Sequence, residues 1–354
     1  MPPTNPAILS IGTSNPPNRY SQEDIYSLVC RYSEFYRTTR VQQIFMNSDI
    51  DYRHLYLDMD SFDGIETTDE LHTRYLRGAM EVGREAIEKC LAAGGFDVQD
   101  IGFIVGVSCT GYLCPGLSSL FVKDLGMRND VQRADLLGMG CAGAMPGLQR
   151  AYDFVKAYPD KKALLVAVEI CSACYYFDDS LDTAVGNAIC GDGAAAVVVG
   201  VTEEKHFPKI LGFATHLEPS YINTVGFVQR EGKLRIILSK DIRDVAGGLA
   251  KTLIDKIFSS YNVSREQISH WILHSGGRKV IDSVQREMGL TDDQVRHSKC
   301  VLKNFGNMSS PTVLFVLNEV LHHTNGSASP QSGDLGIMVA MGPGLAIEGA
   351  LLQW

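Results

Sequence analysis

One cysteine of this 354-residue chain stands in a setting that suits a nucleophile. The stretch 136-LLGMGCAGAMPGL-148 places Cys141 among glycines and alanines, after an apolar run and before a predicted helix. Small neighbours leave room for a carbonyl group to reach the sulfur, and the N–H groups at the start of a helix stabilise a thiolate. A buried structural thiol fits the same stretch, because free cysteines are often small buried hydrophobes. A catalytic interpretation therefore requires partner residues elsewhere.

An internal duplication of the chain supplies candidate partners for this thiol. The first half contains the segments 100-DIGFIVGVSCTG-111, 138-GMGCAGAMPGLQRAYDFV-155 and 191-GDGAAAVVVG-200, and the second half contains 267-QISHWILHSGG-277, 304-NFGNMSSPTVLFVLNEV-320 and 336-GIMVAMGPGLAIEGALL-352. Both sets run in the order strand, helix, then a glycine followed by small residues, a proline and an amphipathic helix. This order makes Gly140-Cys141 equivalent to Gly306-Asn307, and packing of two such copies would bring both turns to a shared centre.

Cys141, Asn307 and His274 form a set that can carry out acyl transfer from a thioester. His274 stands at the end of the predicted strand 268–275. A free thiol with a pKa of about 8.5 is mostly protonated at neutral pH, so an adjacent imidazole would complete its activation. The Asn307 amide, together with His274, can donate hydrogen bonds to an enolate or an oxyanion.

Alternating helix and strand patterns around these residues predict an α/β layered fold. The predicted elements of the first half are helix 69–95, strand 101–108, helix 116–126, strand 131–138, helix 143–157 and strand 163–170. The candidate nucleophile therefore lies in a turn between a strand and a helix. We expect two equivalent halves, 1–205 with the cysteine and 206–354 with the histidine and asparagine, and an exposed loop over 323–334.

Composition and charge exclude several classes of protein. With 45% hydrophobic and 21% charged residues, the chain has the composition of an ordinary globular protein. A net charge of −9 and a pI near 5.5 argue against nucleic acid as a partner. No apolar stretch reaches the ~18 residues that cross a bilayer, and the N-terminus lacks the pattern of a secretory signal. The nine cysteines, odd in number, predict reduced thiols in the cytoplasm.

Cys171 and Cys174 have the C-x-x-C spacing of zinc and redox sites. They follow a predicted buried strand, and no second pair or histidine-rich segment accompanies them. A structural zinc site needs four donors. We therefore expect pocket or core roles for both thiols, and no metal.

The motifs together resemble the type III polyketide synthases, the chalcone synthase-like branch of the thiolase-fold enzymes. The resemblance spans nearly the whole chain and rests on the Cys141 turn, 274-HSGG-277, 305-FGNMSSPTVLFVL-317, 191-GDGAAA-196 and 342-GPGLAIE-348. It implies a thiolase fold with a five-layered αβαβα core, a homodimer and no cofactor. It also implies that Cys141 holds an acyl starter while His274 and Asn307 support decarboxylation of malonyl-CoA for chain extension.

Four positions depart from the plant members of this family and bear on the substrate. By resemblance, Cys190 and Ile236 stand where the plant enzymes have two aromatic gatekeepers. Cys174 replaces the threonine of their starter pocket, and Cys114 replaces the methionine that crosses the dimer. Such changes predict a wide apolar tunnel, in which each buried CH₂ of a chain contributes ~0.8 kcal/mol. We therefore expect a medium- or long-chain fatty acyl or β-ketoacyl starter and an alkylresorcinol or alkylpyrone product. The remaining expected pocket residues are Thr110, Ser309, Gly342 and Pro343.

The entrance for the thioester has fewer basic residues than the resemblance implies. Arg40 keeps the basic character of a helix near the entrance, but Gln43 and Asn47 stand where basic residues are expected. Arg278 and Lys279 directly follow the HSGG motif and are further candidate phosphate ligands. The reduced charge leaves both an acyl-CoA and an acyl carrier protein as candidate donors of the starter.

Other functions share parts of this pattern. A β-ketoacyl-ACP synthase III has the same triad but condenses once, and a dihydroxyphenylacetyl-CoA synthase of the same family uses malonyl-CoA alone. An inactive thiolase-fold scaffold would be free to lose the triad, which is complete here. A papain-like hydrolase fits neither the GNMSSPT motif nor the duplicated halves. The sequence leaves open the starter length, the number of extensions, and closure by aldol or lactone chemistry.

Overall fold

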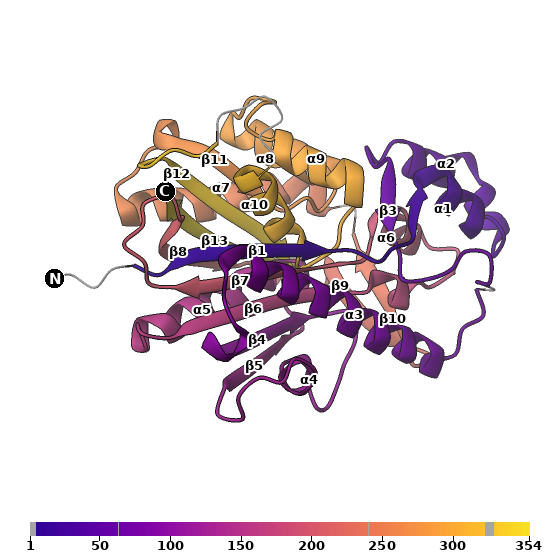
Figure 1. Ribbon diagram of the computed structural model, residues 1–354. Coiled ribbons are helices and arrows are strands. Elements are labelled where there is room, and N and C mark those ends of the chain that lie inside the picture. Colours follow the sequence, from indigo (N-terminus) through magenta and orange to yellow (C-terminus); the bar gives the residue numbers. More distant parts are fainter. Residues whose placement is uncertain (1–4, 63, 240, 323–328) are drawn as a thin grey trace.

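A nine-stranded sheet forms the centre of the structure, a computed structural model that describes residues 5–62, 64–239, 241–322 and 329–354 (Figure 1). Its strands are β1 (Ala7–Ser14), β4 (Ile101–Ser108), β5 (Gln132–Leu137), β6 (Lys162–Glu169), β7 (Gly193–Gly200), β8 (Lys209–Leu217), β11 (Ile268–Leu273), β12 (Leu335–Gly342) and β13 (Ala346–Gln353). Their order across the sheet is β11-β12-β13-β8-β1-β7-β6-β4-β5. Of the predicted loop 323–334, residues 323–328 lie outside the described residues.

The two halves of the chain build their parts of this sheet in the same order. The first half runs β1-β7-β6-β4-β5, and the second runs β8-β13-β12-β11. β6 pairs antiparallel with β7 and parallel with β4, and β12 likewise pairs antiparallel with β13 and parallel with β11. The halves meet where β1 lies beside β8, with Ala7 opposite Lys209. The predicted duplication is therefore visible in the sheet.

Helices and two small strand pairs complete the described part of the chain. The helices are α1 (Gln22–Val29), α2 (Thr39–Met46), α3 (Thr68–Gly94), α4 (Leu117–Asp124), α5 (Ala144–Ala157), α6 (Leu181–Ile189), α7 (Ile242–Tyr261), α8 (Arg278–Met288), α9 (Arg296–Phe305) and α10 (Thr312–His322). The strand pairs are β2 (Arg19–Ser21) with β3 (Tyr52–His54), and β9 (Val225–Arg230) with β10 (Lys233–Leu238).

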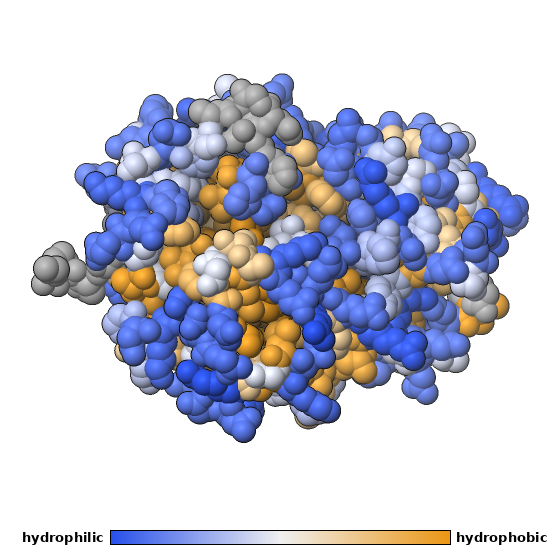
Figure 2. Space-filling model, viewed as in Figure 1, coloured by the Kyte–Doolittle hydropathy of each residue, from blue (hydrophilic) through white to orange (hydrophobic). Residues whose placement is uncertain are grey.

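α5 and α10 form the layer between the two half-sheets. α5 packs on β4 and β6, whereas α10 packs on β11 and also contacts β1 and β7 of the other half. On the outer faces, α3 covers β1 and β7, and α7 covers β8 and β13 with α8 beside it. The central apolar cluster mixes residues of both halves, such as Val105 and Met338. These layers confirm the predicted five-layered thiolase fold. Figure 2 shows apolar side chains near the middle of the view, surrounded by hydrophilic ones.

Local sequence signals explain the elements that lead to the site. β6 and β7 are continuous apolar runs buried on both faces, as is typical of strands covered by helices on two sides. α3 begins with a capping box formed by Thr67 and Glu70, and it ends at Gly95, which has a φ of 65°. The predicted helix 69–95 and strand 101–108 are confirmed as α3 and β4.

A buried arginine ties the N-terminal helical region to the centre of the molecule. Arg53, in β3, is fully buried, and its Nη1 donates to the main-chain oxygens of Asn187 and Cys190, both at 2.7 Å. These oxygens lie at the C-terminal end of α6, where the helix dipole favours a positive charge. The contact fixes the end of α6 and, with it, the position of Cys190.

Candidate active site

The candidate nucleophile lies in a tight turn between β5 and α5. Cys141 is the middle residue of the 3-10 turn Gly140–Ala142. Gly140 has a φ of 53°, a region that favours glycine, and a Cβ built on it would stand 2.3 Å from Cδ of Pro343. A Cβ on Gly342 would meet the main-chain oxygen of the residue before this turn at 2.6 Å. The predicted pocket residues Gly342 and Pro343 thus support the turn of Cys141 from the second half of the chain.

An equivalent turn in the second half holds Asn307. Gly306 has a φ of 69°, and a Cβ built on it would stand 2.6 Å from the main-chain oxygen of Ile189. The N–H of Asn307 donates to that same oxygen at 2.8 Å, and the N–H of Gly191 donates to the main-chain oxygen of Asn307 at 3.0 Å. Cys190 therefore lies directly beside Asn307 in a short parallel bridge, although the two are far apart in the sequence.

Hydrogen bonds fix the orientation of the Asn307 amide. Its Oδ1 accepts from the main-chain N–H of Ser309 at 2.8 Å and from the hydroxyl of Thr312 at 3.4 Å. Its Nδ2 then lies 3.8 Å from the Sγ of Cys141 and donates to the main-chain oxygen of Gly276 at 3.4 Å. The amide therefore directs its N–H groups toward the thiol, where a thioester carbonyl can accept them.

Gly276 also brings His274 to this centre. A Cβ built on Gly276 would stand 3.2 Å from Nε2 and Cδ2 of the imidazole, so the missing side chain lets the ring lie against the main chain. The main-chain N–H of His274 donates to the oxygen of Val339 at 2.9 Å, which continues the pairing of β11 with β12. The ring Nδ1 is buried and has no hydrogen-bond partner among the described residues. The three predicted catalytic residues thus meet, Cys141 and Asn307 by contact and His274 through Gly276.

Burial sets the protonation of the reacting groups. The protein around Cys141 desolvates its sulfur and raises the pKa of the thiol to about 12, although hydrogen bonds from Ser309 and Asn307 oppose this shift. Burial lowers the pKa of His274 to about 4. The resting site therefore holds a neutral thiol and a neutral imidazole. Desolvation thus opposes the expected stabilisation of a thiolate by the start of α5.

Four further cysteines, Cys109, Cys171, Cys174 and Cys190, belong to the candidate site. Each of their thiols interacts with another residue there. The Sγ of Cys109 is 3.3 Å from the hydroxyl of Ser309, and the Sγ of Cys174 donates to the main-chain oxygen of Thr110 at 3.3 Å. Cys171 and Cys190 hydrogen-bond to each other. The sequence predicted pocket positions for Thr110, Cys174, Cys190 and Ser309 and a pocket or core role for Cys171, but it gave no indication of Cys109.

The sequence analysis also missed a buried carboxylate that contacts Cys109 and Thr110. Glu169 is fully buried at the end of β6 and accepts hydrogen bonds from the N–H groups of Cys109 and Thr110 at 2.9 and 3.1 Å. The hydroxyls of Thr110 and Ser310 donate to it at 2.8 and 2.5 Å. Burial raises its pKa, and these donors oppose the shift. Its position at the end of an otherwise apolar strand was the only sequence signal for it.

Four other predicted residues have no described contact with the triad. Cys114 is exposed in the loop after β4. Ile236 packs on Gly186 of α6, where a built Cβ would stand 2.6 Å from its Cγ2. Arg40 and Lys279 are exposed.

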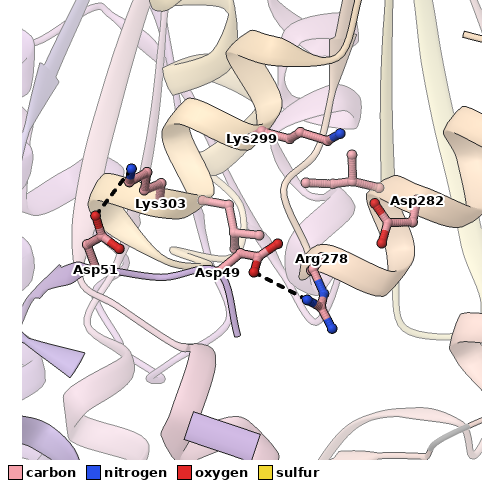
Figure 3. A pocket seen from close by; sticks show the side chains of 8 residues that line it. Asp49, Asp51, Arg278, Asp282, Lys299 and Lys303 are labelled. Carbon is pink, nitrogen blue, oxygen red and sulfur yellow. Dashed lines mark hydrogen bonds and ion pairs between the residues drawn. The ribbon is translucent and has the colours of Figure 1, made fainter. Parts of the chain in front are cut away.

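Two cavities lie along α8, and one residue separates them. The outer cavity, of about 300 Å³, is lined by charged residues that include Arg278, the predicted phosphate ligand (Figure 3). The inner cavity, of about 10 Å³, is lined by His274 and apolar side chains. Ile281 lines both. Arg40 and Lys279 line neither, so of the three predicted phosphate ligands only Arg278 lines one of these cavities.

Two properties of the described residues bear on the chemistry. None of their helices is long and apolar enough to cross a membrane. Nor do three or more His, Cys, Asp and Glu side chains gather among them in a way that could hold a metal ion.

Comparisons with known proteins account for both halves of the chain. The model of the N-terminal domain of chalcone and stilbene synthases matches residues 4–203, and the model of the C-terminal domain matches residues 219–354. A 3,5-dihydroxyphenylacetyl-CoA synthase of Streptomyces toyocaensis is 36% identical, over 99% of this chain and 91% of that protein. A 1,3,6,8-tetrahydroxynaphthalene synthase of Streptomyces peucetius subsp. caesius is 30% identical, over 98% of this chain and 93% of that protein.

The fold is shared with solved structures as well. The crystal structure of PKS-I from the brown alga Ectocarpus siliculosus matches with a TM-score of 0.88 and 28% identity. The match covers 100% of this chain and 99% of that one.

Proposed function

Because the chain belongs to the chalcone and stilbene synthases, a family of type III polyketide synthases, we propose that it condenses malonyl-CoA alone into a polyhydroxylated aromatic product. Enzymes of this family catalyse decarboxylative Claisen condensation of CoA thioesters and need no cofactor. The similarity to synthases named for 3,5-dihydroxyphenylacetyl-CoA and 1,3,6,8-tetrahydroxynaphthalene supports such a product.

The packing of the thiols at the site carries the proposal of a small starter. Cys171 hydrogen-bonds to Cys190, and Cys174 donates to the main chain of Thr110. Thiols that contact one another in this way occupy the space beside the nucleophile instead of facing a long tunnel. A malonyl-derived starter needs no such tunnel, whereas a fatty chain would have to displace these contacts to gain its ~0.8 kcal/mol per buried CH₂.

The geometry accounts for the loading step as follows. When a thioester reaches the site, the Cys141 thiol transfers its proton to the neutral imidazole of His274, and the sulfur attacks the thioester carbonyl. The bond between that carbonyl and the CoA sulfur then breaks, CoA leaves as its thiolate and takes a proton from water, and the acyl group stays on Cys141. Neutral partners suit this order, because no charge has to be held in the buried site before the substrate arrives.

The extension step uses the amide and the imidazolium together. Asn307 Nδ2 and the protonated His274 donate to the thioester oxygen of malonyl-CoA, so the electrons released with CO₂ are held as an enolate. The enolate carbon attacks the acyl carbonyl on Cys141, a carbon–carbon bond forms, and the sulfur leaves as a thiolate. The extended chain can return to that thiolate from CoA for the next cycle.

A second candidate keeps the family and changes the starter. Cys190 and Ile236 stand where the plant enzymes have aromatic rings, and this favours a medium- or long-chain acyl starter leading to an alkylresorcinol or alkylpyrone. In this candidate the starter could come from acyl-CoA or from an acyl carrier protein.

We further propose that the enzyme is a homodimer of the cytoplasm. Among the described residues β5 is an edge strand paired only with β4, and its last residue, Leu137, has an exposed apolar side chain. Such an edge usually has a cover, and a second copy would supply one. The nine unpaired cysteines fit a reducing compartment. Light scattering on the protein as it elutes from a size-exclusion column should give the mass of a dimer, and the mass of a single chain would contradict this proposal.

Product analysis separates the two candidates. Purified protein is incubated with malonyl-CoA alone and with malonyl-CoA plus a C2 to C16 acyl-CoA series, beside a Cys141→Ala control. We expect an aromatic product from malonyl-CoA alone that no acyl-CoA changes and that the control lacks. Alkylated products that peak at medium or long starters would replace the proposal by the second candidate. Silence with every CoA ester, followed by turnover of carrier-protein thioesters, would do the same.

A further inference from the structure

The outer cavity beside α8 has an unusual balance of charge. It lies between the loop before β3 and the helices α8 and α9, as Figure 3 shows. Three carboxylates and three cations line it over an apolar base, namely Asp49, Asp51, Asp282, Arg278, Lys299, Lys303, Ile281 and Leu302. The formal charges of these residues cancel. A site that only had to attract phosphate would be cationic.

Ion pairs hold each of the three cations. Arg278 Nη1 lies 3.3 Å from Asp49 Oδ1, and Lys303 Nζ lies 3.4 Å from Asp51 Oδ2. Figure 3 shows both pairs across the cavity. Lys299 pairs with Asp292 at 2.7 Å, outside the lining. Asp282, by contrast, has no ion pair among the described residues.

The cavity also lies next to the small one at His274. Ile281 forms part of its lining and part of the lining of the small cavity at His274. A thioester whose acyl end reaches His274 past Ile281 would leave its phosphates near Arg278. This placement rests on the proposed function, since it takes a CoA thioester as the substrate.

We propose that Asp49 and Asp51 compete with the phosphates of CoA for Arg278 and Lys303, and so keep the affinity for CoA low. Each extension delivers one malonyl unit and leaves one CoA to be exchanged. A cation that returns to its own carboxylate when CoA departs favours that exchange. Asp49 is a positioning residue in this account, because it acts on CoA through Arg278. Its negative charge also repels the CoA phosphates from Arg278.

The backbone at Asp49 shapes the test. Asp49 has a φ of 59°, a left-handed conformation that asparagine and glycine tolerate and that alanine does not. Asp49→Asn therefore removes the charge without straining the loop. Asp282→Asn is the matched control, because it makes the same change of charge in the same cavity but releases no cation.

Calorimetry with CoA itself is the direct measurement. We expect Asp49→Asn to bind CoA about two- to fivefold more tightly than the native protein, in line with an exposed ion pair, and Asp282→Asn to gain less. Arg278→Gln should weaken CoA binding. The gain of Asp49→Asn over Asp282→Asn should shrink as salt is raised.

Steady-state kinetics and a ligand without phosphate complete the test. Asp49→Asn should raise kcat/KM for malonyl-CoA through a lower KM, and it should leave inhibition by pantetheine unchanged. Equal CoA affinities of Asp49→Asn and Asp282→Asn, or a tighter pantetheine complex, would overturn the proposal. CoA binding is measured without turnover, so this result stands apart from the identity of the starter and product.

Discussion

At the scale of single residues, burial decides the protonation of the two groups that we propose to exchange a proton. It raises the pKa of Cys141 and lowers that of His274, and both shifts remove charge from the resting site. The pair is therefore poised to react only when a substrate supplies an electrophile. The amide of Asn307 is already oriented by Ser309 and needs no rearrangement to receive a carbonyl oxygen.

The pH dependence of alkylation tests this protonation state. A thiol whose pKa is about 12 is a thiolate in a fraction that rises tenfold per pH unit across the range from pH 6 to 9. We expect the rate of Cys141 modification by iodoacetamide to rise steadily over that range, as measured by mass spectrometry of the Cys141 peptide. A plateau below pH 8 would show instead a thiolate already paired with imidazolium. The Cys141→Ala variant is the control, because any alkylation that it still shows comes from the other cysteines.

The meeting of Cys141 with Asn307 could be predicted from the sequence for a definite reason. The duplication aligned the turns at Cys141 and Asn307, so a shared centre followed before any contact was known. The contact of Cys171 with Cys190 could not be predicted, since it joins segments whose pairing depends on the end of α6. The rise in the pKa of Cys141 could not be predicted either, because desolvation depends on all the groups packed around the sulfur.

At the scale of elements, the glycine before the nucleophile meets two demands at once. A side chain at Gly140 would have to adopt a φ of 53° and would collide with Pro343. The turn can therefore approach the second half only without a Cβ. This close approach links the position of the nucleophile to the loop between β12 and β13.

Gly140→Ala should therefore be destabilising and inactive. The left-handed backbone costs about 1–2 kcal/mol, and the collision with Pro343 adds about 1–3 kcal/mol. Gly95→Ala is the matched control, because Gly95 also has a positive φ, of 65°, but nothing lies within 4 Å of its Cβ position. Urea unfolding and product formation measure both variants. Equal losses of stability in the two variants would contradict the role given to the contact with Pro343.

The elements themselves followed from local signals, and the limits of those signals are physical. α3 was predictable because its cap residues and glycine stop lie in the sequence beside it. The packing of Ile236 on Gly186 was not, because β10 and α6 meet only in the folded chain. Likewise, the pairing of Arg278 with Asp49 joins the two halves across a cavity, and neither neighbourhood indicates the other.

At the scale of the whole molecule, the two halves share their central layer. α10 belongs to the second half but contacts β1 and β7 of the first. Apolar residues of both halves, including Phe103 and Leu352, form one buried cluster. A half taken alone would expose this surface to water, at a cost of about 25 cal/mol per Å².

We therefore expect residues 1–205, expressed alone, to lack a stable fold although they carry five strands of the central sheet. Narrow amide dispersion in an NMR spectrum would show this state. Mixing with residues 206–354 should restore the amide dispersion and the pH-dependent alkylation of Cys141 by iodoacetamide. A cooperative unfolding transition of the isolated first half would instead make it an independent domain.

The turns at Cys141 and Asn307 are one backbone device used twice, and this has an evolutionary consequence. In each copy a glycine fixes the path of the chain, and the residue after it supplies the side chain, a thiol in one copy and an amide in the other. One substitution after the glycine therefore changes the chemical group of a copy without changing the glycine that shapes its turn. Duplication followed by such a change accounts for a candidate site whose parts come from both halves of the chain.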